Sequence, residues 1–184
     1  MKNYKTAIHA VSWALVALVL LFVDLATKMV AEARAFAQQK YVLGLVRLWY
    51  VKNTGIAFGM FSDNAVGMTL ITALTIVLII GIGVLAFTVF KKNGAARITL
   101  AVIEAGAVGN LVDRLVLGYV RDFVDISPVG FGICNIADFF ITIGAAVLVF
   151  IILFIGPSAL FPLKKEWREE AKRREEESKK HGAA

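Results

Sequence analysis

The sequence contains few of the residues that form disulfides and metal sites. Cys134 is the only cysteine among 184 residues, which excludes a disulfide within the chain. The only histidines are His9 and His181, one near each end, and they cannot form the His-Glu-x-x-His motif of zinc peptidases. We therefore expect a protein that uses neither a metal ion nor another cofactor.

Charged residues are also scarce, at 18% of the sequence, whereas 59% is hydrophobic and the mean hydropathy is +0.74. This composition is typical of a protein that crosses a membrane several times. A helix needs about 20 apolar residues to span the bilayer. Four stretches approach that length: 7–30, 65–90, 97–117 and 136–161. We predict an all-α bundle of four transmembrane helices as one domain over residues 1–163, followed by a charged cytoplasmic tail over 164–184.

The distribution of lysine and arginine predicts how these helices are oriented. With the N-terminus inside, the inner segments hold 13 of the 20 basic residues and the outer segments hold six. The inner segments are 1–9, 91–97 and 162–184, and the outer segments are 31–64 and 114–135. Because basic residues favour the cytoplasmic side, we expect both termini in the cytoplasm. The net charge of +6 thus reflects topology, and no nucleic-acid partner is expected, since basic residues alternate with glutamates in the tail.

The first span has two interpretations. Lys2 and Lys5 precede an apolar run and Ala35-Phe36-Ala37 resembles a cleavage site, as in a secretory signal peptide. The apolar run exceeds the roughly 7 to 15 residues of a signal-peptide core, which favours a retained helix. Asp24 and Lys28 support retention, because their spacing predicts an ion pair on one helix face and such a pair is costly inside a membrane.

The connection between the first two helices is long enough to hold structure of its own. Residues 42–51 are rich in β-favouring and apolar side chains, so we predict short strands between 40 and 61, on the outer (periplasmic) side. Trp49 and Tyr50 suit the level of the lipid headgroups. This β-rich segment leads to Asn53, which can both donate and accept hydrogen bonds.

The third helix combines small residues with polar ones. Gly106 and Gly109 belong to a face of small side chains that permits close packing between helices. Asn110 and Arg114 follow at the outer end, where Arg114 can bind a carboxylate or a carbonyl. Glu104 lies in the middle of the span and fits either a functional site or a structural carboxyl that is hydrogen-bonded to a neighbouring helix.

Two aspartates lie at the two ends of the loop between the third and fourth helices. Asp122 follows the third helix and Asp138 opens the fourth, so a folded loop would bring both carboxyls to the outer side. Two adjacent carboxyls cannot both ionise cheaply, so one keeps a proton while the other acts as a base, as in aspartic peptidases. Cys134 lies on the same side, but His9 and His181 fall on the cytoplasmic side, so a catalytic thiol is not expected.

Four motifs surround these polar residues. They are Asn53-Thr54-Gly55-Ile56-Ala57-Phe58, Gly109-Asn110-Leu111-Val112-Asp113-Arg114, Val120-Arg121-Asp122-Phe123 and Asn135-Ile136-Ala137-Asp138. Together they resemble the signatures of lipoprotein signal peptidase, the type II signal peptidase of bacteria. The resemblance extends from Asp24 to about Phe161, and Asp24 and Lys28 match the family's Asp-x-x-Thr-Lys. Departures from residues common in the family occur at Gly59, Glu104 and Phe139, and none of them touches the aspartate pair.

The resemblance implies a four-helix aspartic peptidase of the bacterial inner membrane. Such an enzyme removes the signal peptide from diacylglyceryl-modified prolipoproteins just before the lipidated cysteine, on the outer side of the membrane. By the resemblance, Asp122 and Asp138 are the catalytic pair. The supporting residues would be Asn53, Gly109, Asn110, Arg114 and Asn135. We also expect a monomer whose partners are prolipoprotein substrates and membrane lipid.

Intramembrane carboxylates also occur in proton- and ion-coupled transporters, which gives an alternative function. Transporters of that kind usually contain internal repeats, and the sequence shows no convincing repeat. The predicted carboxyl pair also lies at the outer surface, away from the membrane midplane. The peptidase interpretation is therefore preferred.

Overall fold

The structure, a computed structural model, describes residues 2–34, 44–55, 65–91, 93–156, 159–161 and 163–181, with side chains from Val11 in the first helix and Val66 in the second. The helices in these ranges are α1 (Lys2–Ala33), α2 (Ala65–Phe87), α3 (Gly94–Leu117), α4 (Ile136–Phe154), α5 (Lys165–His181) and a single 3-10 turn (Ser127–Val129). The strands are β1 (Arg47–Asn53), β2 (Val120–Asp125) and β3 (Ile133–Cys134). The cleavage-like residues 35–37, the second half of the first motif and Gly59 lie outside the described residues.

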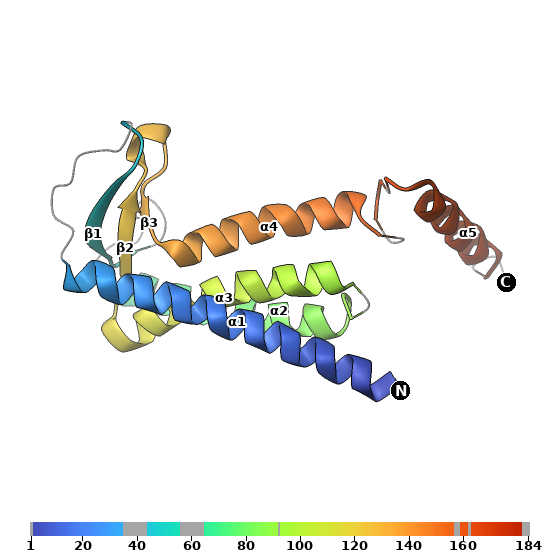
Figure 1. The fold of residues 1–184 in the computed structure, drawn as a ribbon, viewed down its shortest axis with the longest axis horizontal. Helices are drawn as coiled ribbons and strands as arrows, with labels where there is room; N and C mark the ends of the chain where they lie inside the picture. The colour runs from blue at the N-terminus through green and yellow to red at the C-terminus, as the bar shows by residue number, and fades with distance from the viewer. Residues whose placement is uncertain are drawn as a thin grey trace.

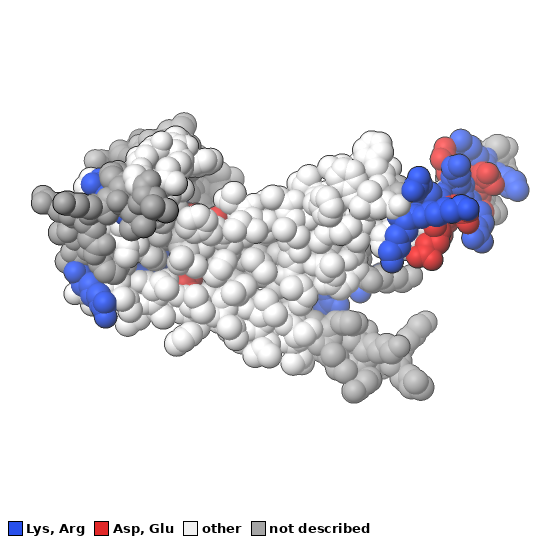
Figure 2. Space-filling view, turned by 45° about the horizontal axis from the view of Figure 1, so that its top comes forward, with Lys and Arg blue, Asp and Glu red and all other residues white. Residues whose placement is uncertain are grey.

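Long apolar helices dominate the chain. In the described part, three of them are long and apolar enough to cross a membrane: Val11–Ala33, Val66–Phe87 and Ile136–Phe154. Their large apolar side chains point outward, with Phe22 72% and Val66 75% exposed. Figure 2 shows a broad middle zone that is almost free of charged side chains, with lysine and arginine at the two ends. The protein is therefore a multi-pass membrane protein.

The helix α3 lies at the centre of the bundle, in contact with α1, α2 and α4. It begins where the side chain of Asn93 accepts a hydrogen bond from the Ala96 N–H, and it ends at Gly118, which has the left-handed φ of 79°. A methyl group at Gly106 would lie 2.5 Å from the Ala137 carbonyl oxygen, so only glycine allows α3 and α4 to approach this closely. The predicted small-residue packing face is confirmed.

The helix α4 is shorter than the predicted span of 136–161. It ends at Phe154, and Gly156 has a left-handed φ of 101°. Proline follows Gly156 in the sequence, and a residue before proline disfavours the helical conformation. The backbone then folds back, and the Phe161 N–H donates to the Leu153 carbonyl at 2.6 Å. The predicted end of this helix was wrong because the glycine–proline stop signal outweighs the apolar run.

A small antiparallel sheet with strand order β1-β2-β3 lies at one end of the bundle, whereas α5 and the start of α1 lie at the other (Figure 1). The predicted strand in the first connection is confirmed as β1. Confining the β-rich part to that connection was wrong, because β2 and β3 come from the connection between α3 and α4. Pairing aligns Val51 with Asp122, Lys52 with Arg121 and Asn53 with Val120.

Candidate active site

Strand β2 directs Asp122 and Arg121 to opposite faces of the sheet, because successive side chains of a strand alternate. Asp122 shares its face with Asn53 of the neighbouring strand, and the Asn53 amide donates a 2.8 Å hydrogen bond to the Asp122 carboxylate. Asn53 is itself oriented by the Gly55 N–H, which donates to its side-chain oxygen at 2.9 Å. Only 2% of Asp122 is exposed, and burial raises its pKa to about 6, with Asp138 as a further cause.

Asp138 is held by the first turn of α4. The side chain of Asn135 caps this helix by accepting a 3.2 Å hydrogen bond from the Asp138 N–H, and the Asp138 carboxylate accepts the Asn135 N–H at 3.0 Å. This reciprocal capping box satisfies two N–H groups of the helix end. The amide of Asn110 on α3 donates to the other Asp138 oxygen at 2.8 Å. The Asp138 carboxylate is therefore fixed by hydrogen bonds from two sides, from Asn135 at the start of α4 and from Asn110 on α3.

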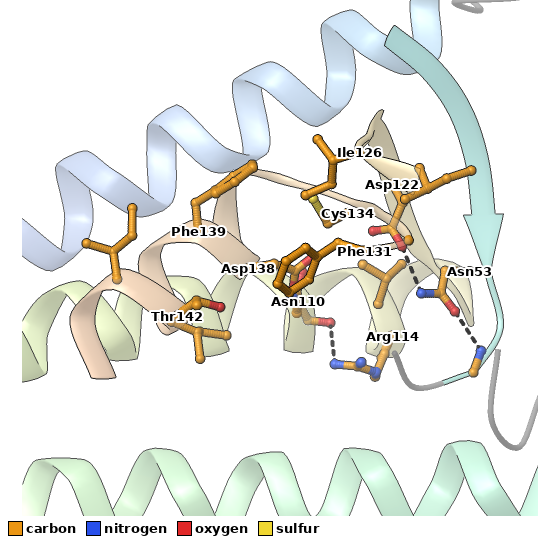
Figure 3. A pocket seen from close by; sticks show the side chains of 16 residues that line it. Asn53, Asn110, Arg114, Asp122, Ile126, Phe131, Cys134, Asp138, Phe139 and Thr142 are labelled. Atoms are coloured by element: carbon orange, nitrogen blue, oxygen red, sulfur yellow. Dashed lines mark hydrogen bonds between the residues drawn. The ribbon is translucent and has the colours of Figure 1, made fainter. Parts of the chain in front are cut away.

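Asn135 links the two aspartates. Its side-chain oxygen accepts from the Asp138 backbone, while its side-chain nitrogen donates a 2.6 Å hydrogen bond to Asp122. The residue is completely buried. One asparagine thus joins the end of β3, the start of α4 and the middle of β2, which brings the carboxyls of Asp122 and Asp138 to the same cavity (Figure 3).

A buried ion cluster lies behind Asn110. The Lys28 ammonium is 2.8 Å from the Asp24 carboxylate and 3.7 Å from that of Asp113, and it donates a 2.8 Å hydrogen bond to the Asn110 side-chain oxygen. Asp24 also accepts the Ala137 N–H at 2.9 Å. The predicted Asp24–Lys28 ion pair is therefore present. Because Lys28 occupies the oxygen of Asn110, the amide nitrogen of Asn110 is directed at Asp138.

The opposite face of β2 is fixed by Arg121. Its guanidinium contacts the Asp113 carboxylate at 2.7 Å and the Glu32 carboxylate at 3.2 Å. Asp113 also accepts the Arg121 backbone N–H at 3.0 Å. The Glu32 carboxylate accepts a 3.2 Å hydrogen bond from the Tyr50 hydroxyl on β1. These contacts attach the sheet to α1 and α3, so the strand that carries Asp122 is connected to the helices around Asp138.

The two aspartates line a cavity of about 480 Å³. Asn53, Asn110, Arg114, Cys134 and Thr142 contribute the other polar side chains, and most other lining residues are apolar: Val120, Ile126, Phe131, Ile133, Phe139, Ile141 and Ile143. Arg114 donates to the Asn110 carbonyl at 3.4 Å, while its Nε is buried and has no hydrogen-bond partner among the described residues. The described part of the chain contains no group of three metal-ligating side chains. The cavity therefore offers two carboxyls, a cation and apolar walls.

Other residues singled out from the sequence have different surroundings. Gly109 lies against Asp24, and a methyl group there would collide with the Asp24 carboxylate. Cys134 lines the cavity, and burial raises its thiol pKa to about 12, with the nearby aspartates adding to the shift. Glu104 does not line the cavity, and one of its oxygens is buried without a hydrogen-bond partner in the described part of the structure.

Sequence reasoning did not identify Arg121 and Glu32 as parts of this arrangement. Glu32 is near the end of an apolar helix and nothing in the sequence pairs it with β2. The capping box of Asn135 and Asp138 was also missed, although an Asn followed three residues later by an acidic residue at a helix start is a readable signal.

Residues 16–154, which include every residue of this site, match the family described as signal peptidase (SPase) II. The chain belongs to this family. Among its relatives, the lipoprotein signal peptidase of Caldanaerobacter subterraneus is 38% identical to this chain over 141 residues. These residues are 73% of this chain and 91% of the relative. The lipoprotein signal peptidase of Thermodesulfovibrio yellowstonii is 35% identical over 154 residues, 82% of this chain and 95% of the relative.

Solved structures agree with the family assignment. A bacterial membrane enzyme superposes with a TM-score of 0.70 at 27% identity, over 77% of this chain and 87% of that protein. A second bacterial membrane enzyme gives a TM-score of 0.68 at 26% identity, over 77% and 92% of the two chains. The signal peptidase II family consists of proteases that process lipoproteins, so membership favours the peptidase interpretation over the transporter.

Proposed function

We propose that this protein is a membrane aspartic endopeptidase that removes the signal peptide from diacylglyceryl-modified prolipoproteins, with cleavage just before the lipidated cysteine. The relatives carry the name lipoprotein signal peptidase. The observation that carries the aspartic assignment is the position of the buried Asn135. It is hydrogen-bonded to both Asp122 and Asp138, and these two aspartates line one cavity.

The two carboxyls have different surroundings, which suggests different roles. Asp122 is buried and its pKa is raised to about 6, so it is the better holder of the shared proton. Asp138 lies in the first turn of α4, where the helix dipole and two N–H donors stabilise a negative charge. In this proposal Asp138 takes a proton from water as the water oxygen attacks the scissile carbonyl. Asp122 donates a hydrogen bond to the carbonyl oxygen, and a proton then passes to the leaving nitrogen.

The remaining cavity groups fit an amide substrate with apolar flanks. The buried Nε of Arg114 lacks a partner among the described residues and is available to a substrate carbonyl. Phe131, Phe139 and Ile141 provide apolar surface for a signal peptide or an acyl chain. Each buried methylene of the lipid contributes about 0.8 kcal/mol, so the diacylglyceryl group supplies binding energy while the hydrogen bonds align the amide.

For the membrane arrangement we propose four spans, with α3 as the one that composition alone does not identify. Arg97, Glu104, Asp113 and Arg114 make α3 too charged for an ordinary span, but its contacts with α1, α2 and α4 shield it from lipid. Four spans leave both termini on one side and the sheet on the other. The distribution of basic residues favours a cytoplasmic location for the termini, so the cavity would lie on the outer side, with residues 1–163 as one peptidase domain, monomeric in the membrane, and 164–184 as a cytoplasmic tail.

The proposal is tested by cleavage assays on the purified full-length protein. We expect cleavage of a diacylglyceryl prolipoprotein before its modified cysteine, in the presence or absence of a chelator. The same prolipoprotein without lipid is the matched control and should be cleaved far more slowly. Loss of activity with chelator would contradict an aspartic mechanism, and equal cleavage of the unmodified substrate would contradict recognition of the lipid.

A further inference from the structure

A second group of buried polar atoms lies at the end of the bundle opposite the sheet. Arg97, in the first turn of α3, is only 5% exposed, and its Nε and Nη2 have no hydrogen-bond partner among the described residues. The indole nitrogen of Trp13 on α1 is also buried without a partner there. Both side chains pack on Phe87 of α2: the Trp13 ring is 5.3 Å from the Phe87 centroid, and the Arg97 guanidinium carbon is 5.1 Å from it. Three helices thus meet at one cluster, which contains two side chains with free donors.

The contact with Phe87 does not satisfy these donors. A cation–π contact with an aromatic ring is an electrostatic attraction and supplies no oxygen acceptor for the N–H groups of the guanidinium. No Asp or Glu in the described residues lies within ion-pair distance of Arg97, unlike the case of Lys28 and Arg121. A buried donor without an acceptor is strongly unfavourable, and more so when it is charged. The cluster therefore requires an acceptor from outside the described part of the protein.

The donors indicate the chemistry of that acceptor. A guanidinium fork binds phosphate or carboxylate oxygens in two parallel hydrogen bonds. Arg97 lies next to the N-terminus of α3, where the helix dipole also favours an anion. Apolar helices surround the cluster, as at a membrane surface where phospholipid headgroups lie. We propose that Arg97 and Trp13 form a binding site for the phosphate of an anionic phospholipid that joins α1, α2 and α3 at this end of the bundle.

This site is separate from the aspartate cavity and does not depend on peptidase activity. A lipid held there would stabilise the bundle in anionic membranes through a contact that detergent removes. The recognised group is a phosphate with net negative charge, which phosphatidylcholine lacks because its choline is a cation. Inorganic phosphate also carries this charge, and the acyl chains distinguish it from an anionic phospholipid. The experiment therefore compares both sources.

The test uses the purified full-length protein in detergent, with bound lipid counted by native mass spectrometry and stability followed by thermal unfolding. The additions are phosphatidylglycerol, phosphatidylcholine with the same acyl chains, or inorganic phosphate. We expect phosphatidylglycerol to bind and to raise the unfolding temperature, with a much smaller effect of the other two. Arg97→Gln should weaken phosphatidylglycerol binding by about 10-fold or more, and Trp13→Phe, which removes one neutral donor, by about 2-fold to 10-fold.

Lys91→Gln is the control, because it removes the same charge from an exposed position at the same end of the bundle. It should keep most of the binding and the stabilisation. Equal stabilisation by phosphatidylcholine, an unchanged response in Arg97→Gln, or an equal loss in Lys91→Gln would each overturn the site. Equal protection by inorganic phosphate would overturn the lipid as its occupant. If Arg97→Gln does not fold, the comparison of Trp13→Phe with Lys91→Gln decides the question in the same way.

Discussion

The buried cations at the two ends of the helix bundle have different surroundings. At the sheet end, Lys28 is completely buried between the carboxylates of Asp24 and Asp113. At the other end, Arg97 is almost equally buried but has no carboxylate within ion-pair distance among the described residues. Lys28 is therefore compensated by carboxylates of the protein, whereas Arg97 has no such carboxylate in the described part of the chain.

The two cations also differ in the side chains that they hold in place. Lys28 holds the oxygen of Asn110, and Asn110 in turn donates to Asp138, so the internal pairing determines the geometry of the cavity. Rigid support of this kind keeps reactive groups in place during a reaction. The Arg97 guanidinium lies over the Phe87 ring, and Arg97 does not line the cavity. The contrast can be tested by removing groups at each end.

The largest effect should come from the aspartates themselves. Asp122→Asn and Asp138→Asn each keep the shape of the side chain but cannot carry the shared proton, so we expect a loss of cleavage of about 10²-fold to 10⁴-fold. The double variant should be scarcely slower than either single one, because the pair acts as a unit. Rates are compared on a diacylglyceryl prolipoprotein after the variants are shown to have similar unfolding temperatures.

Asp125→Asn is the matched control for this series. Asp125 is on the same strand and is buried, but it pairs with Arg47 at 2.6 Å and does not line the cavity. It should therefore keep most of the cleavage rate of the unaltered protein. Near-normal cleavage by a well-folded Asp122→Asn or Asp138→Asn variant would remove the aspartic assignment.

The next effect compares the two buried cations directly. Lys28→Met leaves Asp24 buried without its cation and leaves Asp113 with Arg121 alone, which should lower the free energy of unfolding by about 3–5 kcal/mol. Arg97→Met removes a charge that has no carboxylate partner among the described residues, so in detergent without anionic lipid its cost should be far smaller. Thermal unfolding of both variants in the same detergent measures the difference. Equal destabilisation would mean that Arg97 has an internal partner after all.

The sequence was sufficient to predict the long helices and the proximity of Asp122 and Asp138, but not the hydrogen bonds that hold these aspartates in place. Long apolar runs predict α1, α2 and α4, and a family motif surrounds Asp122 and Asp138. Strand β2 was missed because its polar residues, Arg121 and Asp122, alternate to two faces that are both buried, so the usual apolar–polar alternation is absent. Its partner β1 lies about seventy residues earlier in the chain, and such pairing depends on tertiary contacts.

The ion pairs of buried charged residues can likewise be predicted from the sequence only in part. The spacing of Asp24 and Lys28 predicts their ion pair, since residues four apart on a helix are neighbours. The contact of Arg121 with Glu32 joins two positions separated by 89 residues and has no local signature. The burial of Arg97 without a carboxylate partner among the described residues cannot be predicted from the sequence, because it depends on how three helices pack around Phe87.

A moderate effect is expected from Asn53. Its amide donates to Asp122 and lowers the pKa of that carboxyl against the opposing effect of burial, so Asn53→Ala should raise the Asp122 pKa above about 6. As pH rises through this pKa, Asp122 loses the proton that the proposed mechanism needs, and activity should fall. In Asn53→Ala this alkaline decline should move to higher pH, together with a lower maximal rate. Complete pH profiles of kcat/KM provide the measurement, and an unchanged or downward-shifted decline would contradict the role of this hydrogen bond.

The smallest effect should come from Cys134, which tests whether every polar group at the sheet end is required. Cys134 lines the cavity, but its only hydrogen bond among the described residues is a 3.5 Å contact to the Val124 carbonyl. Serine is smaller and can donate the same bond, so Cys134→Ser should keep most of the cleavage rate. The raised thiol pKa, about 12, also predicts slow labelling by maleimide near neutral pH, because the thiolate is the reactive form. Labelling that nevertheless blocks cleavage would reflect the size of the adduct beside Asn135, whereas inactivity of a folded Cys134→Ser variant would show that the thiol itself takes part.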